Sequence, residues 1–155
     1  MNGKAACRIY LIRHGETANA SEVCFNGHFD VDLSDQGKKQ SRRIADALKE
    51  LPIKAVYSSD LKRAQIGAQH VADKHKLKHT PCKELRELAF GDWEGLSIAE
   101  VNRNYPGQLK ERLKNTEQFH VKGGESFFQL SDRVIPKFEE IISRHPDDNI
   151  VILCH

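Results

Sequence analysis

The sequence predicts an α/β fold: a three-layer α/β/α sandwich around a mostly parallel central sheet. Two observations support this prediction. Short apolar segments typical of strands alternate with longer segments whose apolar residues recur at helical spacing. Polar side chains also follow three of the strand-like segments directly. Alternation of strands and helices favours a parallel sheet, and such sheets bind ligands beyond the carboxyl ends of their strands. We therefore expect a site at that edge.

The first third of the chain predicts a strand, a long loop and a helix. Residues 8–12 form a short apolar run, which predicts a buried strand. Residues 15–33 show no period, and loops of that length are usually functional or disordered. Ser34 is a predicted N-cap, and Pro52 ends the helix that follows. The apolar stripe of this helix consists of Ile44, Ala45, Leu48 and Leu51.

A second strand and helix are predicted next. Residues 53–57 predict the strand, and the polar run 58–60 supplies cap candidates for a helix over 61–76. Residues 79–82 predict a weak strand. The helical positions expected to face inward are Ile66, Ala68, Val71 and Ala72.

The last part of the chain predicts three helices and a strand. Two short helical stretches are separated by Pro106 and Gly107, and the pair Gly123-Gly124 is expected to open a longer helix. Pro136 should kink that helix or mark its first part as a separate turn. Residues 149–154 predict the final strand. The apolar side of the long helix comprises Phe127, Phe128, Leu130, Val134, Phe138, Ile141 and Ile142.

The bulk composition indicates one domain over residues 1–155. A net charge of +2 is too small for a typical nucleic-acid binder, and no apolar stretch approaches the ~20 residues of a membrane span. The four cysteines match no zinc signature and are interpreted as reduced thiols, which favours a cytoplasmic protein. His70, His75 and His79 lack carboxylate partners at ligand spacing, so we predict no metal site there.

The segment from Arg13 to Thr17 contains the side chains best suited to chemistry. An imidazole has a pKa of about 6.5 and is a competent nucleophile near neutral pH. Arginine offers a fork of donors that matches phosphate oxygens, and Gly15 would let the backbone approach a ligand. For an isolated pair, however, a strand-end histidine beside a surface arginine is the better explanation.

The pair is not isolated, because further motifs follow in order. They are Leu11-Ile12-Arg13-His14-Gly15-Glu16-Thr17, Phe25-Asn26-Gly27, Ser58-Ser59-Asp60-Leu61 with Arg63, Leu85-Arg86-Glu87 with Trp93-Glu94-Gly95, Gly123-Gly124-Glu125-Ser126, and Val151-Ile152-Leu153-Cys154-His155. Together they resemble the histidine phosphatase (phosphoglycerate-mutase-like) superfamily over nearly the whole chain.

The resemblance implies a role for each matching residue. His14 attacks phosphorus, while Arg13, Arg63 and His155 surround the phosphoryl oxygens. Glu87 protonates the leaving alkoxide and then takes a proton from water; Glu84 and Glu94 are its rivals for this role. Asn26 and Gly27 contribute polar contacts to the substrate. His28 lies in the same loop, but we expect it to contact neighbouring protein residues and not the substrate.

The sequence departs from the family pattern at two places. The family usually has an asparagine six residues after the catalytic histidine, where this chain has Ala20; we expect Asn19 to substitute in substrate binding through a loop shift. The family also continues past its second histidine. The sequence ends at His155, so the C-terminal part of the fold is expected to be missing and a carboxylate to lie near the phosphate pocket. A truncated product and impaired activity are both consistent with that ending.

Three functions stay open from the sequence. The resemblance implies a phosphomonoester hydrolase that needs no metal or other cofactor and acts on a small phosphorylated metabolite; α-ribazole 5′-phosphate is the candidate substrate. The short cap, residues 96–122, favours hydrolysis over a cofactor-dependent phosphoglycerate mutase. An inactive phosphate-binding fragment is the third alternative. We predict neither nucleic acid nor membrane as a partner and leave a homodimer open.

Overall fold

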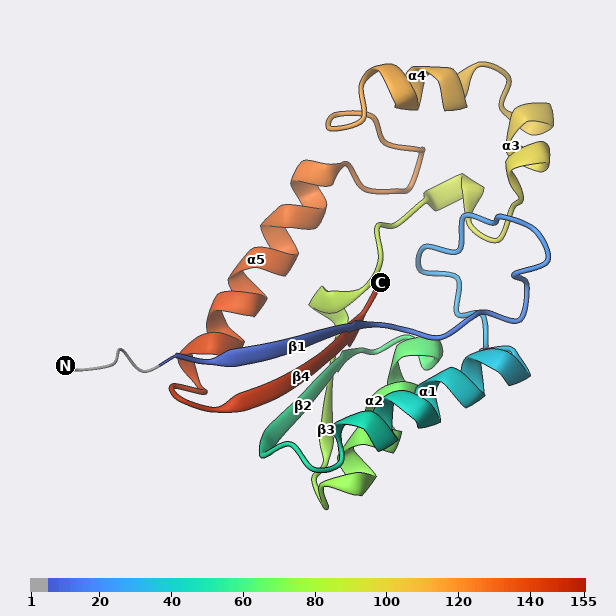
Figure 1. The fold of residues 1–155 in the computed structure, drawn as a ribbon. Helices are drawn as coiled ribbons and strands as arrows, with labels where there is room; N and C mark the ends of the chain where they lie inside the picture. Colours follow the sequence, from blue (N-terminus) through green and yellow to red (C-terminus); the bar gives the residue numbers. More distant parts are fainter. Residues whose placement is uncertain (1–5) are drawn as a thin grey trace.

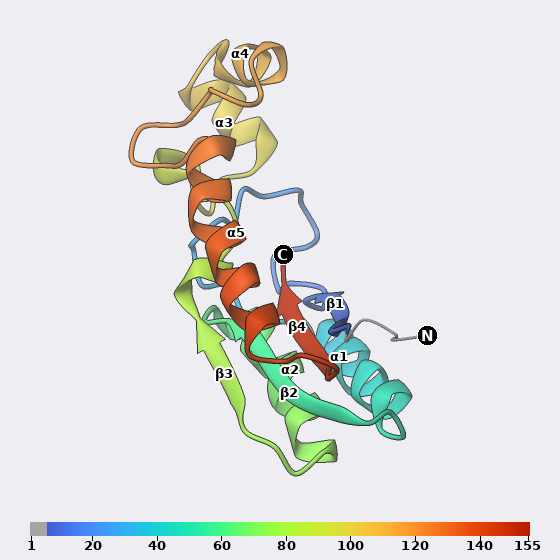
Figure 2. The ribbon, with the colours of Figure 1, turned by 90° about the vertical axis from the view of Figure 1, so that its left-hand side faces the viewer.

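The computed structural model describes residues 6–155. Its strands are β1 (Arg8–Arg13), β2 (Ile53–Ser59), β3 (His79–Cys82) and β4 (Asn149–Cys154), and its α-helices are α1 (Asp35–Leu48), α2 (Lys62–Lys74), α3 (Ile98–Asn104), α4 (Gln108–Lys114) and α5 (Phe127–Ser143). The strands form one parallel sheet in the order β1-β4-β2-β3. Helices α1 and α2 cover one face and α5 covers the other (Figures 1 and 2), which confirms the predicted three-layer α/β/α fold.

Strand β4 shows how one apolar run builds two cores. Its side chains alternate between the two faces of the sheet, as the period of a strand requires. Val151 and Leu153 pack into the core beneath α1 and α2, whereas Ile150 and Ile152 join the core beneath α5. All four are at most 2% exposed, so β4 is the central buried strand of the sheet. A continuous apolar run is the expected sequence of such a strand.

Strand β1 corrects the prediction of a buried first strand. It pairs only with β4 and is an edge strand, so one side of its backbone has no strand beside it within residues 6–155. Leu11 is 60% exposed, although Ile9, on the same face of β1, packs against the core beneath α5. The opposite face of β1 packs against α1 and α2 through Tyr10 and Ile12.

The starts of the first two helices differ in how they are capped. Ser34 caps α1 as predicted, because its hydroxyl oxygen accepts from the amide of Gly37 at 3.0 Å. The predicted cap of the next helix is wrong, since β2 extends through Ser59 and α2 begins only at Lys62. Asp30 of the long loop instead accepts from the Lys62 amide at 2.8 Å. A distant loop thus supplies this cap.

Helix α5 begins later than predicted and runs without interruption. Ser126 and Gln129 form a capping box, so the helix starts after Ser126 and not at the glycine pair. Pro136 lies within the continuous helix and removes only the amide donor that would reach Asp132, which is exposed. Phe127, Phe128 and Ile142 were predicted on the apolar side but are 38–55% exposed.

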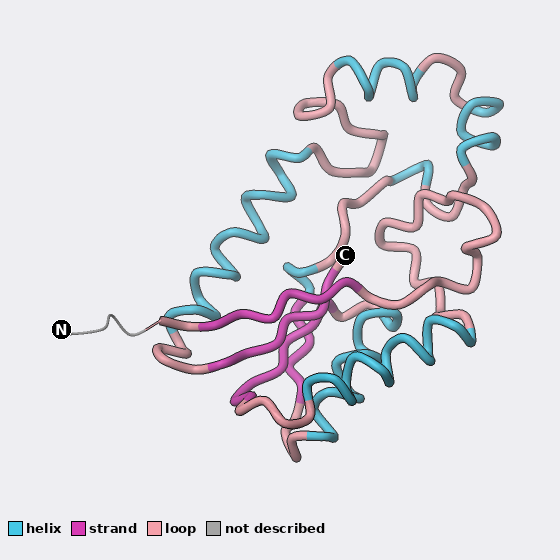
Figure 3. The backbone as a smooth tube through the Cα atoms, viewed as in Figure 1, coloured by secondary structure: helices cyan, strands magenta, loops and turns pink. Residues whose placement is uncertain are grey.

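Helices α3 and α4 form a small cap beyond the carboxyl ends of the strands (Figure 1). Pro106 and Gly107 separate the two helices, as predicted. Trp93, Val101 and Val121 form the buried centre of a third core there. Figure 3 shows that the segments joining this cap to the sheet are mostly loops. Among residues 6–155, no helix combines the length and hydropathy needed to cross a membrane.

Candidate active site

Two histidines meet where the adjacent strands β1 and β4 end. Arg13 stands opposite Cys154 in the sheet register, so the next residues, His14 and His155, lie side by side. The His14 amide donates to the Cys154 carbonyl at 3.1 Å, which ties the two strand ends together. The imidazole centroids are 5.0 Å apart. The parallel register thereby joins residues that are far apart in the sequence.

His14 is held as a neutral base with one free nitrogen. Its Nδ1 lies 2.7 Å from the Gly15 carbonyl oxygen, which can only accept, so Nδ1 carries the hydrogen and Nε2 keeps its lone pair. The pKa of His14 is lowered from 6.5 to about 4, mainly by burial; the charges of Arg63 and Arg13 add to the shift and the Gly15 bond opposes it. At neutral pH the ring is therefore an available nucleophile.

His155 is neutral for similar reasons. Burial is the main cause that lowers the pKa of His155 to about 2, followed by the charge of Arg63 and by His14. Neither ring nitrogen has a hydrogen-bond partner within the described part of the chain, although both are buried. Buried polar atoms are nearly always paired, so both nitrogens are open to a hydrogen bond with a ligand.

Two arginines provide the positive charge of the site. Arg63, at the start of α2, is 1% exposed, and its two terminal nitrogens donate to the carbonyls of Phe29 and Gly27. Its buried Nε has no partner among residues 6–155. Arg13 is exposed at the end of β1 and lines the same cleft. Through these hydrogen bonds Arg63 also holds the loop at residues 27–29 in place.

The geometry selects Glu87 among the three candidate acids. Glu87 lines the cleft with His14, Arg13 and Arg63, and its Oε1 accepts from the Leu88 amide at 2.8 Å. Glu94 is occupied elsewhere, because its Oε1 accepts from the amides of His28 and Phe90. Glu84 lines a separate pocket with His28 and Arg133.

Residues 84–90, here called the acid loop, are held in place by Arg133 of α5, a residue that the sequence motifs did not include. Arg133 donates to the carbonyls of Glu84, Arg86 and Glu87 at 2.7–2.9 Å and makes a bidentate ion pair with Glu125. His28 Nε2 also lies 3.0 Å from the Glu87 carbonyl, so it contacts this loop and not the cleft. No sequence pattern marked Arg133; the only signal was Glu125 in the glycine-rich motif.

The two asparagines form a pair. Asn19 Nδ2 donates to Asn26 Oδ1 at 2.7 Å, and Asn26 Nδ2 donates back to Asn19 at 3.2 Å. Asn26 and Gly27 line the cleft together with Ala20, whereas Asn19 supports Asn26 from outside the lining. In this structure Asn19 thus contacts Asn26, and its contact with substrate stays a prediction.

Gly15 is needed for a close backbone crossing that the sequence did not predict. A Cβ atom at Gly15 would lie 2.5 Å from the carbonyl oxygen of Gly37 and 2.9 Å from its Cα, which are prohibitively short distances. A Cβ atom at Gly37 would in turn clash with the backbone of Glu16. The two glycines let the chain after β1 cross the first turn of α1 at close range. Gly15 is therefore required for this crossing, and the approach of its backbone to a ligand stays a prediction.

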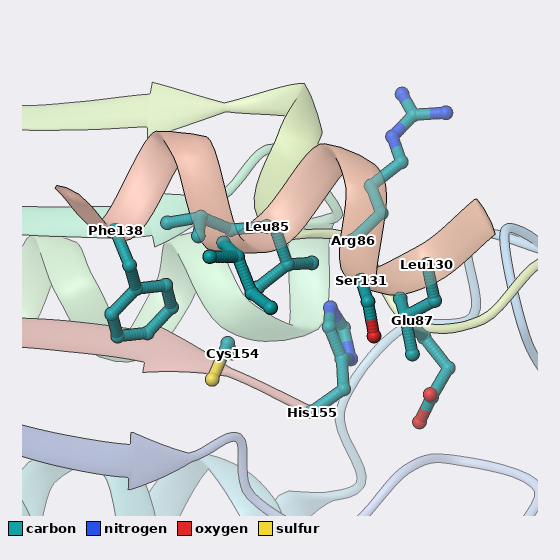
Figure 4. Close-up of a pocket in the computed structure, with 10 residues that line it drawn as sticks. Leu85, Arg86, Glu87, Leu130, Ser131, Phe138, Cys154 and His155 are labelled. Carbon is teal, nitrogen blue, oxygen red and sulfur yellow. The ribbon is translucent and has the colours of Figure 1, made fainter. Parts of the chain in front are cut away.

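The catalytic candidates other than His155 line a cleft of about 370 Å³. Arg13, His14, Asn26, Gly27, Arg63 and Glu87 line it with the aromatic rings of Phe25 and Phe90. A second, mostly apolar groove of about 220 Å³ lies between α5 and the end of β4 (Figure 4), and His155 and Glu87 border it. Ser58 and Ser59 are the last residues of β2 and line neither space.

A metal centre finds no support in the site geometry. Within residues 6–155, no group of three or more histidine, cysteine, aspartate or glutamate side chains is arranged to hold a metal ion. His79 Nδ1 instead lies 3.1 Å from the amide oxygen of Gln69. The positive charge that faces the cleft comes from Arg13 and Arg63.

Fold and site together define a class: a parallel α/β protein with two histidines side by side at adjacent strand ends, near two arginines and one carboxylic acid. The chain belongs to the histidine phosphatase superfamily (branch 1), whose family model matches residues 9–155.

Known proteins of several names resemble this chain. It is 39% identical to "Phosphoglycerate mutase-like protein 4" of Arabidopsis thaliana, covering 95% of this chain and 65% of that protein. It is 30% identical to "Phosphoserine phosphatase 1" of Hydrogenobacter thermophilus, covering 96% and 70%. The crystal structure of the α-ribazole phosphatase from Shigella flexneri superimposes with a TM-score of 0.87 at 28% identity, covering 96% and 73%. The chain thus spans about two thirds of the length of the curated relatives.

Proposed function

We propose that this protein hydrolyses phosphomonoesters of small metabolites through a phosphohistidine formed on His14, without a metal ion. The observation that carries the proposal is the state of His14. Its ring is neutral, its Nδ1 hydrogen is fixed on the Gly15 carbonyl, and its Nε2 is free beside two arginines. A rigid neutral imidazole is the form that attacks phosphorus.

The residues divide the first chemical step between them. His14 Nε2 forms a bond to phosphorus while the bond from phosphorus to the ester oxygen breaks. Arg13, Arg63 and His155 stabilise the charge on the three equatorial oxygens, as phosphoryl transfer requires. The carboxyl group of Glu87 gives its proton to the leaving oxygen, and the alcohol departs.

The second step regenerates the protein. Water attacks the phosphorus of phosphohistidine, the carboxylate of Glu87 takes the proton from that water, and the bond to Nε2 breaks. Inorganic phosphate leaves and His14 is neutral again. Asn26 and Gly27 contribute polar contacts at the cleft wall, and residues 96–122 cover the site as a short cap.

The substrate is proposed at the level of a small phosphorylated metabolite. The likeness to α-ribazole phosphatase favours α-ribazole 5′-phosphate, while the relative named for phosphoserine favours a smaller ester. The four cysteines are free thiols in the described chain, which fits our proposal of a cytoplasmic protein.

The proposal is tested with p-nitrophenyl phosphate in the presence of EDTA. We expect turnover by the wild-type chain and a loss of roughly 10³-fold or more in His14→Ala, because the covalent step has no other nucleophile. Acid quench should trap a phosphorylated protein that is absent from the variant. His70→Ala, at an outlying histidine, is the matched control and should keep wild-type turnover.

Other results would point to the alternatives. Isomerisation of phosphoglycerate without net release of phosphate would indicate a mutase. Binding of vanadate without any turnover would indicate a phosphate-binding protein. Loss of turnover on chelation would contradict a metal-independent mechanism.

A further inference from the structure

His28 lies where two loops of the candidate active site meet. The loop around it is held by Arg63, which donates to the carbonyls of Gly27 and Phe29. A Cβ atom at Gly27 would lie only 3.0 Å from the carbonyl oxygen of Leu88 in the acid loop, so the two backbones leave no room for a side chain between them. The loop held by Arg63 is therefore in direct contact with the loop that carries the acid.

The imidazole of His28 crosses this contact on the side away from the cleft. It does not line the cleft and instead borders a smaller cavity of about 170 Å³ with Glu125 and Arg133. Its Nε2 lies 3.0 Å from the backbone carbonyl oxygen of Glu87. A carbonyl oxygen only accepts, so Nε2 carries the ring hydrogen and donates it. Burial lowers the pKa of His28, so the ring is neutral at neutral pH and Nδ1 has no hydrogen.

The carbonyl of Glu87 accepts from two different parts of the fold. Arg133 of α5 donates to it at 2.7 Å and His28 at 3.0 Å, which satisfies the two lone pairs of a carbonyl oxygen. Arg133 ties this carbonyl to α5, whereas His28 ties it to the loop that Arg63 holds. Glu94 adds a parallel link, because its Oε1 accepts from the amide of His28 and from an amide of the acid loop.

We propose that His28 is a positioning residue that fixes the acid Glu87 relative to Arg63. This inference rests on the proposed function, in which Arg63 contacts the phosphoryl oxygens and Glu87 protonates the leaving oxygen. The two groups come from separate elements, so their separation depends on the contacts between them. A displacement of about 1 Å in a catalytic group can lower the rate by roughly 10²-fold. His28 itself touches no reacting atom.

The test replaces His28 by one side chain that keeps a donor and by one that does not. Glutamine has an amide nitrogen at a reach similar to that of Nε2, whereas leucine has a similar size and no donor. For O-phosphoethanolamine, whose leaving alkoxide needs a proton, we expect His28→Leu to lower kcat by about 10- to 100-fold with little change in KM. His28→Gln should recover most of that loss. p-Nitrophenyl phosphate, with its weakly basic leaving group, should be affected much less.

A double-mutant cycle separates the positioning of Glu87 from a general loss of structure. In Glu87→Gln, which already lacks the acid, His28→Leu should lower kcat for O-phosphoethanolamine by no more than about twofold. His120→Leu, at an exposed histidine of the cap, is the control and should keep the wild-type kcat. Equal losses for the two esters, the full loss in the Glu87→Gln background, or no recovery in His28→Gln would overturn the inference.

Failure of this inference and failure of the proposed function give different results. Turnover that depends on His14 but is unchanged in His28→Leu overturns the inference alone. For a chain without turnover, calorimetric binding of vanadate, an analogue of the transferred phosphoryl group, replaces kcat. There, weaker binding in His28→Leu that His28→Gln restores supports the inference, and equal Kd values or no binding to the wild-type chain overturn it.

Discussion

At the scale of single residues, the state of His14 depends on its neighbours. Burial is the largest cause of its low pKa, but Arg13 and Arg63 also contribute. Arg63 cannot be changed cleanly, because it also holds the loop carbonyls of Gly27 and Phe29. Arg13 is exposed and makes no such bonds, so its charge can be removed with little effect on the surrounding structure.

Arg13→Gln should raise the pKa of His14 above 4 while leaving it below 6.5, because burial persists when the charge is removed. The measurement is an NMR titration of the His14 ring, assigned with His14→Gln. Arg8→Gln, at the exposed start of the same strand, serves as the control and should leave the titration unchanged. An unchanged or lower pKa in Arg13→Gln would show that the charge of Arg13 does not reach the ring.

Residue types identified the site better than they identified individual contacts. The motifs placed His14, Arg13, Arg63, Glu87 and His155, and the structure brings all five to one region. The roles of Gly15 and Asn19 depend on which segment lies against them. Gly15 faces Gly37, and Asn19 faces Asn26; neither neighbour follows from local sequence.

At the scale of elements, the acid loop depends on α5. Residues 84–87 form no long helix or strand, so their carbonyls need partners from elsewhere. Arg133 supplies donors to three of these carbonyls, and Glu125 fixes Arg133 in turn. Arg133 touches no reacting atom in the proposed mechanism and acts as a positioning residue for Glu87.

Arg133→Gln should lower kcat most for esters whose leaving group needs a proton. For O-phosphoethanolamine we expect a loss of about 10- to 100-fold, part of the roughly 10²–10⁴-fold that general acid catalysis supplies. p-Nitrophenyl phosphate has a weakly basic leaving group and should lose much less. Arg144→Gln, which breaks an exposed ion pair at the other end of α5, is the control. Equal losses for both esters would mean that Arg133 has only a structural role.

The predicted elements were correct in kind and less accurate at their ends. The spacing of apolar residues and the capping residues located α1 and the final strand, because those signals are local in sequence. The start of α2 was predicted to within a residue but its cap was predicted wrongly, since the Lys62 amide is capped by Asp30, 32 residues earlier. The edge position of β1 was equally invisible, because a short apolar run looks the same at the centre of a sheet and at its edge.

At the scale of the whole molecule, the two buried histidines link stability to pH. Their folded-state pKa values are about 4 and about 2, against 6.5 for an exposed histidine. Between pH 6.5 and 4 the unfolded chain therefore binds more protons than the folded chain. The linkage relation then requires the free energy of unfolding to fall as the pH falls through that range. Above pH 6.5 both states are neutral at these positions and the effect vanishes.

We expect urea unfolding to show a smaller loss of stability between pH 7 and 5 in the double variant His14→Asn, His155→Asn than in the wild-type chain. The comparison of slopes removes the contribution of the carboxylates, which titrate in both proteins. His120→Asn, an exposed histidine of the cap, should keep the wild-type slope. Identical slopes in all three proteins would contradict the low pKa values of the buried pair.

The sequence by itself determined the fold class, the order of the elements and the residue types of the site, because apolar period, caps and short motifs are local properties of a chain. The tertiary structure decided what depends on neighbours distant in sequence. The register of β1 and β4 placed the two histidines together, and the packing of α5 brought Arg133 to the acid loop. The packing of the cap placed the guanidinium of Arg112 beside Phe90.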